Sequence, residues 1–212
     1  ESEDESEDES EDESEDESED ESVIADYTKE IELDPMFLDA YIIRGMAYHN
    51  VKRYPEAIAD STKAIDLDPK HALAYLIRGG AYYLSKKYTE SITDFTKIIE
   101  LDPKDFGDED LRAVAYNNRG KVYDDLKKYP MAIADYSKAI DLSPKDAKAC
   151  FNRGNAYVEL KKYPEAILDF TKAIELDPMY ALAHSNRGLA YEALGKTKEA
   201  KADFAKAKSL EN

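Results

Sequence analysis

The sequence predicts an all-α protein, a right-handed superhelical solenoid of helix–turn–helix units. The first observation is a recurring dipeptide, spaced by 34, 41, 34 and 34 residues. It occurs at Arg44-Gly45, Arg78-Gly79, Arg119-Gly120, Arg153-Gly154 and Arg187-Gly188. The second observation is that small and apolar residues surround each copy at helical spacing. The third is a proline-bearing turn that separates two such stretches in most copies.

The first complete unit shows why each copy reads as two helices. Its first helix has one face of Tyr41, Gly45 and Tyr48, and its second has one face of Ala57, Ser61 and Ala64. Proline is favoured at the first position of a helix, so Tyr54-Pro55 marks the start of the second helix. Asp68-Pro69 ends it, because the residue before a proline is disfavoured in helical geometry.

The repeat divides the chain into eight segments. They are an acidic low-complexity tail at 1–22, the second helix of a truncated repeat at 23–35, repeats at 38–71 and 72–105, an insertion at 106–112, and repeats at 113–146, 147–180 and 181–212. The tail holds sixteen acidic residues and no basic or apolar one, so we expect it to be disordered in isolation. The insertion is expected to lengthen the helix that follows it by about a turn.

The truncated repeat carries an apolar stripe that lacks the helix expected to cover it. The stripe consists of Val23, Ile24, Tyr27 and Ile31. Two alternatives remain open on the sequence alone. Either the first complete repeat covers the stripe, or another chain does.

The repeat resembles the tetratricopeptide repeat, a helix–turn–helix unit of 34 residues. The matching glycines are Gly45, Gly79, Gly120, Gly154 and Gly188, each with a tyrosine three residues later. The matching closing prolines are Pro69, Pro103, Pro144 and Pro178. Arginine stands before each glycine, where the family usually has a large apolar residue. The resemblance implies a non-enzymatic scaffold that binds a partner protein or an extended peptide in the concave groove lined by the first helices.

An aspartate follows each of these arginines by sixteen residues. The pairs are Arg44 and Asp60, Arg78 and Asp94, Arg119 and Asp135, Arg153 and Asp169, and Arg187 and Asp203. An arginine at a partly internal site keeps its charge and needs a partner, so we expect a structural ladder of ion pairs. The pairs could form within a repeat or between repeats, for example from Asp26 to Arg44. A lysine three residues after each aspartate, such as Lys63, is a rival partner.

The resemblance also implies which residues line the groove. The residue before each arginine should point into it, and Asn118, Asn152 and Asn186 hold this place in consecutive repeats. They resemble the asparagine ladder of the O-linked N-acetylglucosamine transferase superhelix. A carboxamide both donates and accepts, so it can bind a peptide backbone. The full expected set is Ile43, Met46, Ile77, Tyr83, Asn118, Lys121, Lys148, Asn152, Asn155 and Asn186. We expect an apolar anchor on its first half and an extended backbone on its second. The alternative is three solvated asparagines on a polar face.

A second resemblance concerns the carboxylate clamp of heat-shock co-chaperones. Asn155 and Asn186 stand in clamp-like places, but Phe151 replaces the expected lysine. Binding of an acidic C-terminus is therefore a weaker hypothesis than binding of a generic peptide.

Several other classes of function lack support in the composition. The folded part carries 31 acidic and 29 basic residues, so no basic surface predicts a nucleic-acid partner. No apolar run approaches the roughly 20 residues of a membrane span. The three histidines have no metal-ligand spacing, and no cofactor or catalytic group is expected. A single cysteine, Cys150, excludes an internal disulfide and fits a reducing, cytoplasmic location.

Two functions from different classes follow. The first is an interaction scaffold for a protein or peptide ligand. The second is a self-associating structural module, a homo-oligomer in which the acidic tail or the truncated repeat joins identical chains.

Overall fold

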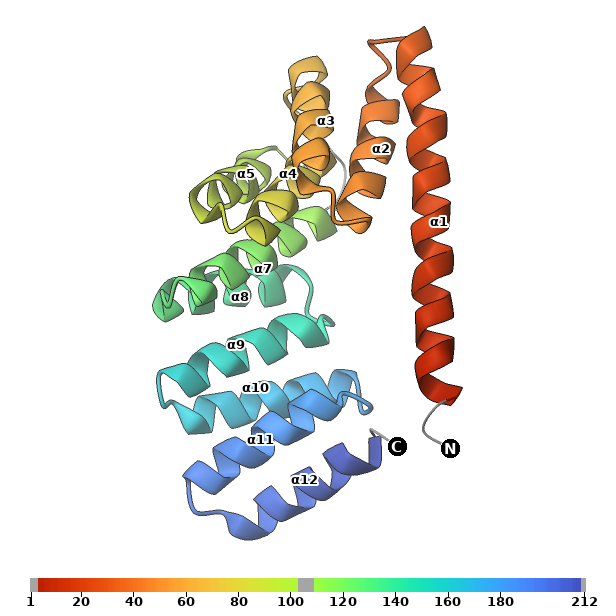
Figure 1. The fold of residues 1–212 in the computed structure, drawn as a ribbon. Helices are drawn as coiled ribbons and strands as arrows, with labels where there is room; N and C mark the ends of the chain where they lie inside the picture. Colours follow the sequence, from red (N-terminus) through yellow and green to blue (C-terminus); the bar gives the residue numbers. More distant parts are fainter. Residues whose placement is uncertain (1–3, 103–108, 211–212) are drawn as a thin grey trace. The chain divides into compact units, whose positions relative to one another are not determined.

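The computed structural model of the chain describes residues 4–102 and 109–210, with side chains from Ser18 onward and, after the gap, from Asp110. The chain forms two compact units, Glu1–Gly107 and Asp108–Asn212, and each is described by itself. Within the described residues every regular element is an α-helix (Figure 1). The prediction of an all-α fold built from helical hairpins is confirmed.

The first unit contains α1 (Asp4–Leu33), α2 (Leu38–Asn50), α3 (Tyr54–Leu67), α4 (Ala72–Leu84) and α5 (Tyr88–Glu100). The second unit contains α7 (Glu109–Asp125), α8 (Tyr129–Leu142), α9 (Ala147–Glu159), α10 (Tyr163–Leu176), α11 (Ala181–Ala193) and α12 (Thr197–Leu210). Helices that follow one another within a unit pack together, so each repeat is a hairpin stacked on the next. The first helices of the repeats are α2, α4, α7, α9 and α11.

The recurring spacing of glycine and aromatic residues brings the two helices of a hairpin into close contact. A Cβ atom placed on Gly154 would lie 2.7 Å from Cε1 of Phe170, a contact that real side chains do not make. The first repeat differs, because Ser61 replaces the aromatic and a Cβ atom on Gly45 would lie 3.4 Å from its Oγ. Four of the five hairpins therefore require glycine, and the first does not.

The turn inside each hairpin contains one residue in the left-handed conformation. That residue is Lys52, Lys86, Lys127, Lys161 or Gly195, with φ between 57° and 73°. In the fourth repeat the N–H of Lys162 donates to the carbonyl of Tyr157 and the N–H of Lys161 donates to that of Val158. This bonding satisfies carbonyls that the end of α9 would otherwise leave unpaired.

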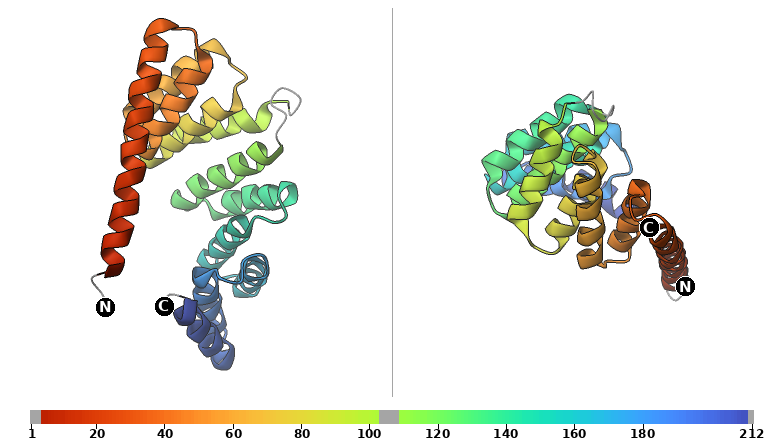
Figure 2. Two further views of the ribbon diagram at one scale, coloured as in Figure 1. Left: turned by 90° about the vertical axis from the view of Figure 1, so that its right-hand side faces the viewer. Right: turned by 90° about the horizontal axis from the view of Figure 1, so that it is seen from above.

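Residues 4–22 of the acidic tail, expected to be disordered in isolation, are helical in the chain. They form the first 19 of the 30 residues of α1, which continues without a break into the truncated repeat (Figure 2). The composition argued against a helix nucleating there alone. Extending a helix that residues 23–33 have already nucleated needs no new nucleus, and glutamate is a good helix former.

The apolar stripe of the truncated repeat is covered by the first complete repeat. α1 packs on α2, and Ile24 is 7% exposed. Ile31 packs against the cluster formed by Tyr41, Ile42 and their buried neighbours. The sequence left open whether the first complete repeat or another chain covers the stripe. At Ile24 and Ile31 the chain's own first complete repeat covers it.

The insertion falls partly outside the described residues, since 106–108 are not among them. The rest of it, Glu109–Arg112, belongs to α7. This helix has 17 residues, whereas α9 and α11 have 13 each.

Candidate functional site

Each arginine binds the aspartate of its own repeat through two parallel hydrogen bonds. The Nε atoms donate to Oδ2 at 2.7–2.8 Å, and the Nη2 atoms donate to Oδ1 at 2.7–2.8 Å. The five pairs are Arg44–Asp60, Arg78–Asp94, Arg119–Asp135, Arg153–Asp169 and Arg187–Asp203. The side chains of these aspartates are at most 8% exposed. A buried carboxylate with a bidentate partner is a strong, directional link between the two helices of a hairpin.

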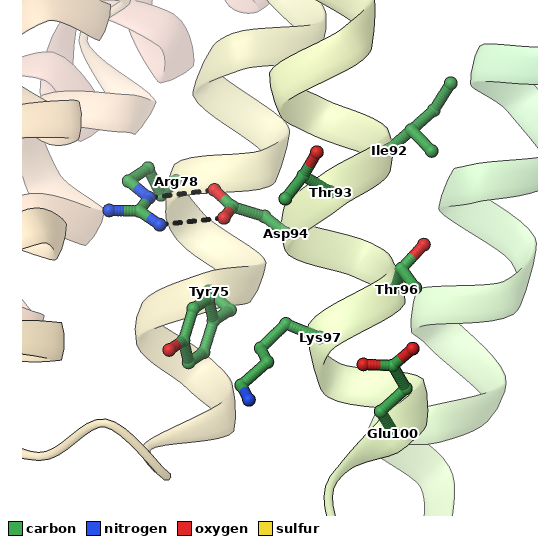
Figure 3. Close-up of a pocket in the computed structure, with 8 residues that line it drawn as sticks. All are labelled: Tyr75, Arg78, Ile92, Thr93, Asp94, Thr96, Lys97 and Glu100. Carbon is green, nitrogen blue, oxygen red and sulfur yellow. Dashed lines mark hydrogen bonds and ion pairs between the residues drawn. The ribbon is translucent and has the colours of Figure 1, made fainter.

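Figure 3 shows this arrangement in the second repeat, where Arg78 on α4 faces Asp94 on α5. The guanidinium carbon of Arg78 also lies 5.6 Å from the ring centroid of Tyr75. The hydrogen bond to Asp94 is the main cause that raises the pKa of Arg78 above its ordinary value. Burial is the main cause that raises the pKa of Asp94, opposed by the bond from Arg78.

The connection to the preceding repeat is made by a hydroxyl group. Nη1 of Arg44 donates to Oγ1 of Thr28 at 2.9 Å, and Nη1 of Arg78 donates to Oγ1 of Thr62 at 3.1 Å. In the second unit, Arg153 and Arg187 bind Ser137 and Thr171 in the same way. The acid therefore pairs within a repeat, and the guanidinium also links that repeat to the one before it.

Sequence reasoning missed these hydroxyls, although a signal was present. A serine or threonine stands two residues after the aspartate at Thr28, Thr62, Thr96, Ser137 and Thr171. The rival contact, from an aspartate to the lysine three residues later, occurs at Asp26, whose described partner is not an arginine. There, Nζ of Lys29 lies 3.0 Å from Oδ1 of Asp26.

The first helices of the second unit each present one stripe of residues at helical spacing. The stripes are Val114, Asn118, Lys121 and Asp125 on α7; Lys148, Asn152, Asn155 and Glu159 on α9; and Leu182, Asn186, Leu189 and Ala193 on α11. We call these three stripes the inner face of the second unit. All twelve residues are half-buried or exposed. The side chains of Val114, Leu182 and Leu189, which sequence reasoning omitted, are 41%, 58% and 52% exposed.

Hydrogen bonds between carboxamides connect the three helices. Nδ2 of Asn152 on α9 donates to Oδ1 of Asn117 on α7 at 3.1 Å. Nδ2 of Asn186 on α11 donates to Oδ1 of Asn155 on α9 at 2.8 Å. Asn117 is buried and was not predicted, because it lies one position before Asn118. These bonds fix the orientation of the carboxamides in consecutive repeats.

The apolar half of the predicted groove lies in the first unit and is smaller than expected. Ile77 is 7% exposed and packs in the core with Ile42, so the prediction that it lines an open groove is wrong. The side chain is apolar and turns into the space between α2, α3 and α4. Tyr83 packs on Tyr88, with 6.2 Å between ring centroids. Ile43 is half-buried, and Met46 is 43% exposed.

The place of the clamp lysine is filled by a packed ring. The Phe151 centroid lies 4.8 Å from that of Tyr180 and 5.7 Å from that of Phe170. Asn155 and Asn186, the other clamp-like residues, are hydrogen-bonded to each other. Phe151 therefore brings no positive charge to the place of the clamp lysine.

One carboxylate at the end of α7 is held in an unfavourable environment. Oδ1 of Asp124 is buried and has no hydrogen-bond partner within the described part of the chain. Burial, followed by the negative charges of Asp125 and Glu159, raises the pKa of Asp124 to about 6. This group therefore titrates near neutral pH.

Other chemistry finds little support among residues 18–102 and 110–210. No group of three potential metal ligands is found in this part of the chain. Burial raises the pKa of the Cys150 thiol, which makes it a poor nucleophile. No helix over the described residues is long and apolar enough to cross a membrane.

The chain matches known proteins in both sequence and structure. Models described as tetratricopeptide repeat match residues 53–106, 113–146 and 181–212, and one described as TPR repeat matches residues 154–195. No significant match is found among curated protein sequences.

Two solved structures illustrate the structural likeness. The crystal structure of YrrB, described as a TPR protein with an unusual peptide-binding site, has a TM-score of 0.66 and 26% identity, covering 87% of this chain and 91% of YrrB. The crystal structure of MamA has a TM-score of 0.70 and 26% identity, covering 79% of this chain and 94% of MamA.

The repeats and these structural neighbours support a protein-interaction scaffold. The glycine contacts, the helical hairpins and the four family matches agree with one another. The chain is a member of the tetratricopeptide repeat family.

Proposed function

We propose that this chain binds an extended peptide across the inner face of its second unit. The observation that carries the proposal is the pair of inter-repeat carboxamide bonds, Asn152 to Asn117 and Asn186 to Asn155. Each bond uses one donor and one acceptor, and leaves other hydrogen-bonding atoms of the same side chains unused. A preorganised set of carboxamides loses little conformational entropy when it binds a ligand.

The remaining atoms match the needs of an extended backbone. Oδ1 of Asn152 and Oδ1 of Asn186 can accept from peptide N–H groups, and Nδ2 of Asn155 can donate to a peptide carbonyl. Stacked helices lie about 8–10 Å apart, and an extended chain rises about 3.3 Å per residue. One asparagine therefore meets about every third residue of the peptide.

Side chains around the asparagines suggest what such a peptide contains. Leu182 and Leu189 flank Asn186 on α11 and are more than half exposed, which suits an apolar side chain of the ligand. Lys148 on α9 is exposed, and Lys121 on α7 is half-buried. These two cations suit an acidic residue of the ligand. That residue would bind at α9 or α7, one or two first helices away from the leucines of α11.

YrrB offers a parallel for a peptide site in this family, since its structure is described with an unusual peptide-binding site. The similarity, with 26% identity over most of both chains, supports the same class of function for this chain.

The experiment selects ligands with the full-length chain from a phage library of random twelve-residue peptides. We expect the chain to enrich peptides that combine an apolar and an acidic residue. The variant Asn118→Ala/Asn152→Ala/Asn186→Ala should lose this enrichment. A control variant, Lys138→Gln/Lys172→Gln, changes exposed residues of α8 and α10 and should retain it. The same peptides recovered with the triple variant, or no enrichment by the chain itself, would refute the proposal.

The alternative of a self-associating module has weaker support. The apolar stripe that suggested it is partly covered, because Ile24 is buried by the chain's own packing.

A further inference from the structure

The second half of α1 occupies the register of a second helix whose first helix is absent from the described structure. The hydrogen bond from Arg44 to Thr28 identifies this register, because Arg78 binds Thr62 in the same way. Thr62 lies two residues after Asp60, and Thr28 lies two residues after Asp26. Asp26 therefore corresponds to the aspartates that bind an arginine in every complete repeat.

The environment of Asp26 differs sharply from that of its counterparts. Its side chain is 69% exposed, whereas the five paired aspartates are at most 8% exposed. Its described partner is Lys29, three residues away on the same helix and itself 70% exposed. Asp26, Tyr27 and Glu30 line an open hollow on this side of α1, together with Phe37.

The residue after Asp26 also corresponds to a residue that packs on a first helix in the complete repeats. In four of the five complete repeats an aromatic follows the aspartate and packs on the glycine of the first helix, as Phe170 does on Gly154. Tyr27 holds this position in α1, and it is half-buried. α1 thus presents a carboxylate and an aromatic ring at adjacent positions. Elsewhere in the molecule, the same two positions of a second helix contact the Arg-Gly pair of a first helix.

We propose that this side of α1, formed by Val23, Asp26, Tyr27 and Glu30 and here called the open face, binds a helix of another protein that carries an Arg-Gly pair. The arginine would bind Asp26 through two hydrogen bonds, and the glycine would lie against Tyr27. This surface lies in the first unit, so the inference is independent of the peptide site proposed for the second.

Glu30 adds a requirement for the partner. It stands where the complete repeats have Ala64 and Ala173, each of which shares a core cluster with the residue three before the arginine, Tyr41 and Cys150. A carboxylate at this place favours a cation opposite it. The partner helix therefore carries a basic residue three positions before its arginine, in the pattern basic-x-x-Arg-Gly.

A second copy of this chain is a poor occupant. All five of its Arg-Gly pairs are engaged with their own aspartates, so a copy would have to open one of its hairpins to supply one. Opening a hairpin breaks a buried ion pair and separates the two packed helices, which is costly. The chain's own helices instead provide a probe. α11 carries His184 three residues before Arg187, which makes it the best match to the open face.

The test uses a fluorescein-labelled peptide of residues 181–196, ALAHSNRGLAYEALGK, and the full-length chain. A lactam between Glu192 and Lys196, which are both exposed in the chain, holds the peptide helical. Fluorescence anisotropy is expected to show saturable binding, tightened by His184→Lys in the peptide. Asp26→Asn in the protein, or Arg187→Gln in the peptide, should weaken binding about tenfold, equivalent to about 1.4 kcal/mol.

The matched control is Glu32→Gln, which removes another exposed charge from α1 and should leave the affinity within about twofold. Binding that is absent up to about 1 mM peptide, or equal for the Asp26→Asn and unaltered chains, would overturn the proposal. Sedimentation of the chain alone supplies a further check. A dimer that Asp26→Asn abolishes would show that the open face takes a second copy instead, and would also overturn it.

Discussion

Asn186 on α11 donates a hydrogen bond from Nδ2 to Oδ1 of Asn155 on α9, at 2.8 Å. The bond joins the exposed stripes of two consecutive repeats, away from the core that holds the hairpins together. A polar bond at this place orders the surface as well as stabilising the stack. It connects the stability of the second unit with its proposed ligand site.

The stability contribution of this bond can be measured directly. Asn155→Leu removes the acceptor of Asn186, and the free energy of unfolding should fall by about 0.5–1.5 kcal/mol. Asn118→Ala is the matched control, because Asn118 has no described hydrogen bond, and its effect should stay within about 0.5 kcal/mol. Urea denaturation followed by circular dichroism compares the two. Equal losses would mean that the Asn186–Asn155 bond adds nothing to the stack.

Breaking one buried ion pair should cost far more. Arg153→Met leaves Asp169 charged and without its bidentate partner, at 8% side-chain exposure. We expect a loss of about 3–5 kcal/mol. The control is Arg53→Met, whose pair with Glu56 is about 40% exposed on both sides, and it should shift the denaturation midpoint far less. Similar denaturation midpoints for the two variants would contradict a structural role for the ladder.

The glycines of the first and fourth repeats should respond differently to the same change. Gly154→Ala forces a Cβ atom to within 2.7 Å of Phe170 and should destabilise the chain by about 1–3 kcal/mol. Gly45→Ala meets only ordinary contacts near Ser61, and alanine favours a helix over glycine by about 1 kcal/mol. Thermal melts of the two variants should therefore move in opposite directions. Destabilisation by both would show that the first hairpin is packed as tightly as the fourth.

The pH dependence of stability should include a contribution from Asp124. Its folded-state pKa of about 6 is above the ordinary value of 3.8, so the folded chain binds the proton more tightly than the unfolded chain. The resulting stabilisation is fully present below about pH 4 and is lost as the pH rises through 6. Asp124→Asn should remove this slope and raise stability at pH 7.5 by about 1 kcal/mol, allowing for solvent screening.

Urea denaturation at pH 4, 5, 6 and 7.5 tests that prediction. Asp141→Asn is the control, since its side chain is 70% exposed, and it should leave the slope unchanged. A slope that persists in Asp124→Asn would assign the titration to a different group.

The repeat itself could be read from the sequence because its packing residues recur at a fixed period. Glycine, aromatic and small residues meet inside one hairpin, so their spacing carries the three-dimensional contact. The arginine and the aspartate sixteen residues later belong to the same class of signal. The sequence left open whether each arginine pairs within its own repeat. The second helices of its own and of the preceding repeat both carry an aspartate at the equivalent position.

Other features depend on relations that spacing does not reveal. Ile77 is buried, whereas Ile43 and Asn118 at equivalent positions are half-buried, so the repeat position alone does not fix the burial of a side chain. The carboxamide bonds join Asn152 to a residue 35 positions away and Asn186 to one 31 positions away, so they follow from the registry of neighbouring helices and not from a repeat position. The helical start of α1 depends on a neighbouring segment as nucleus, which composition does not reveal.

The most direct test of the central claim is the affinity of a library-selected peptide for the full-length chain and for Asn118→Ala/Asn152→Ala/Asn186→Ala, measured by isothermal titration calorimetry. We expect at least about 30-fold weaker binding by the triple variant, equivalent to about 2 kcal/mol for the hydrogen bonds that are lost. Dissociation constants that agree within about twofold would contradict the claim that these carboxamides hold the ligand.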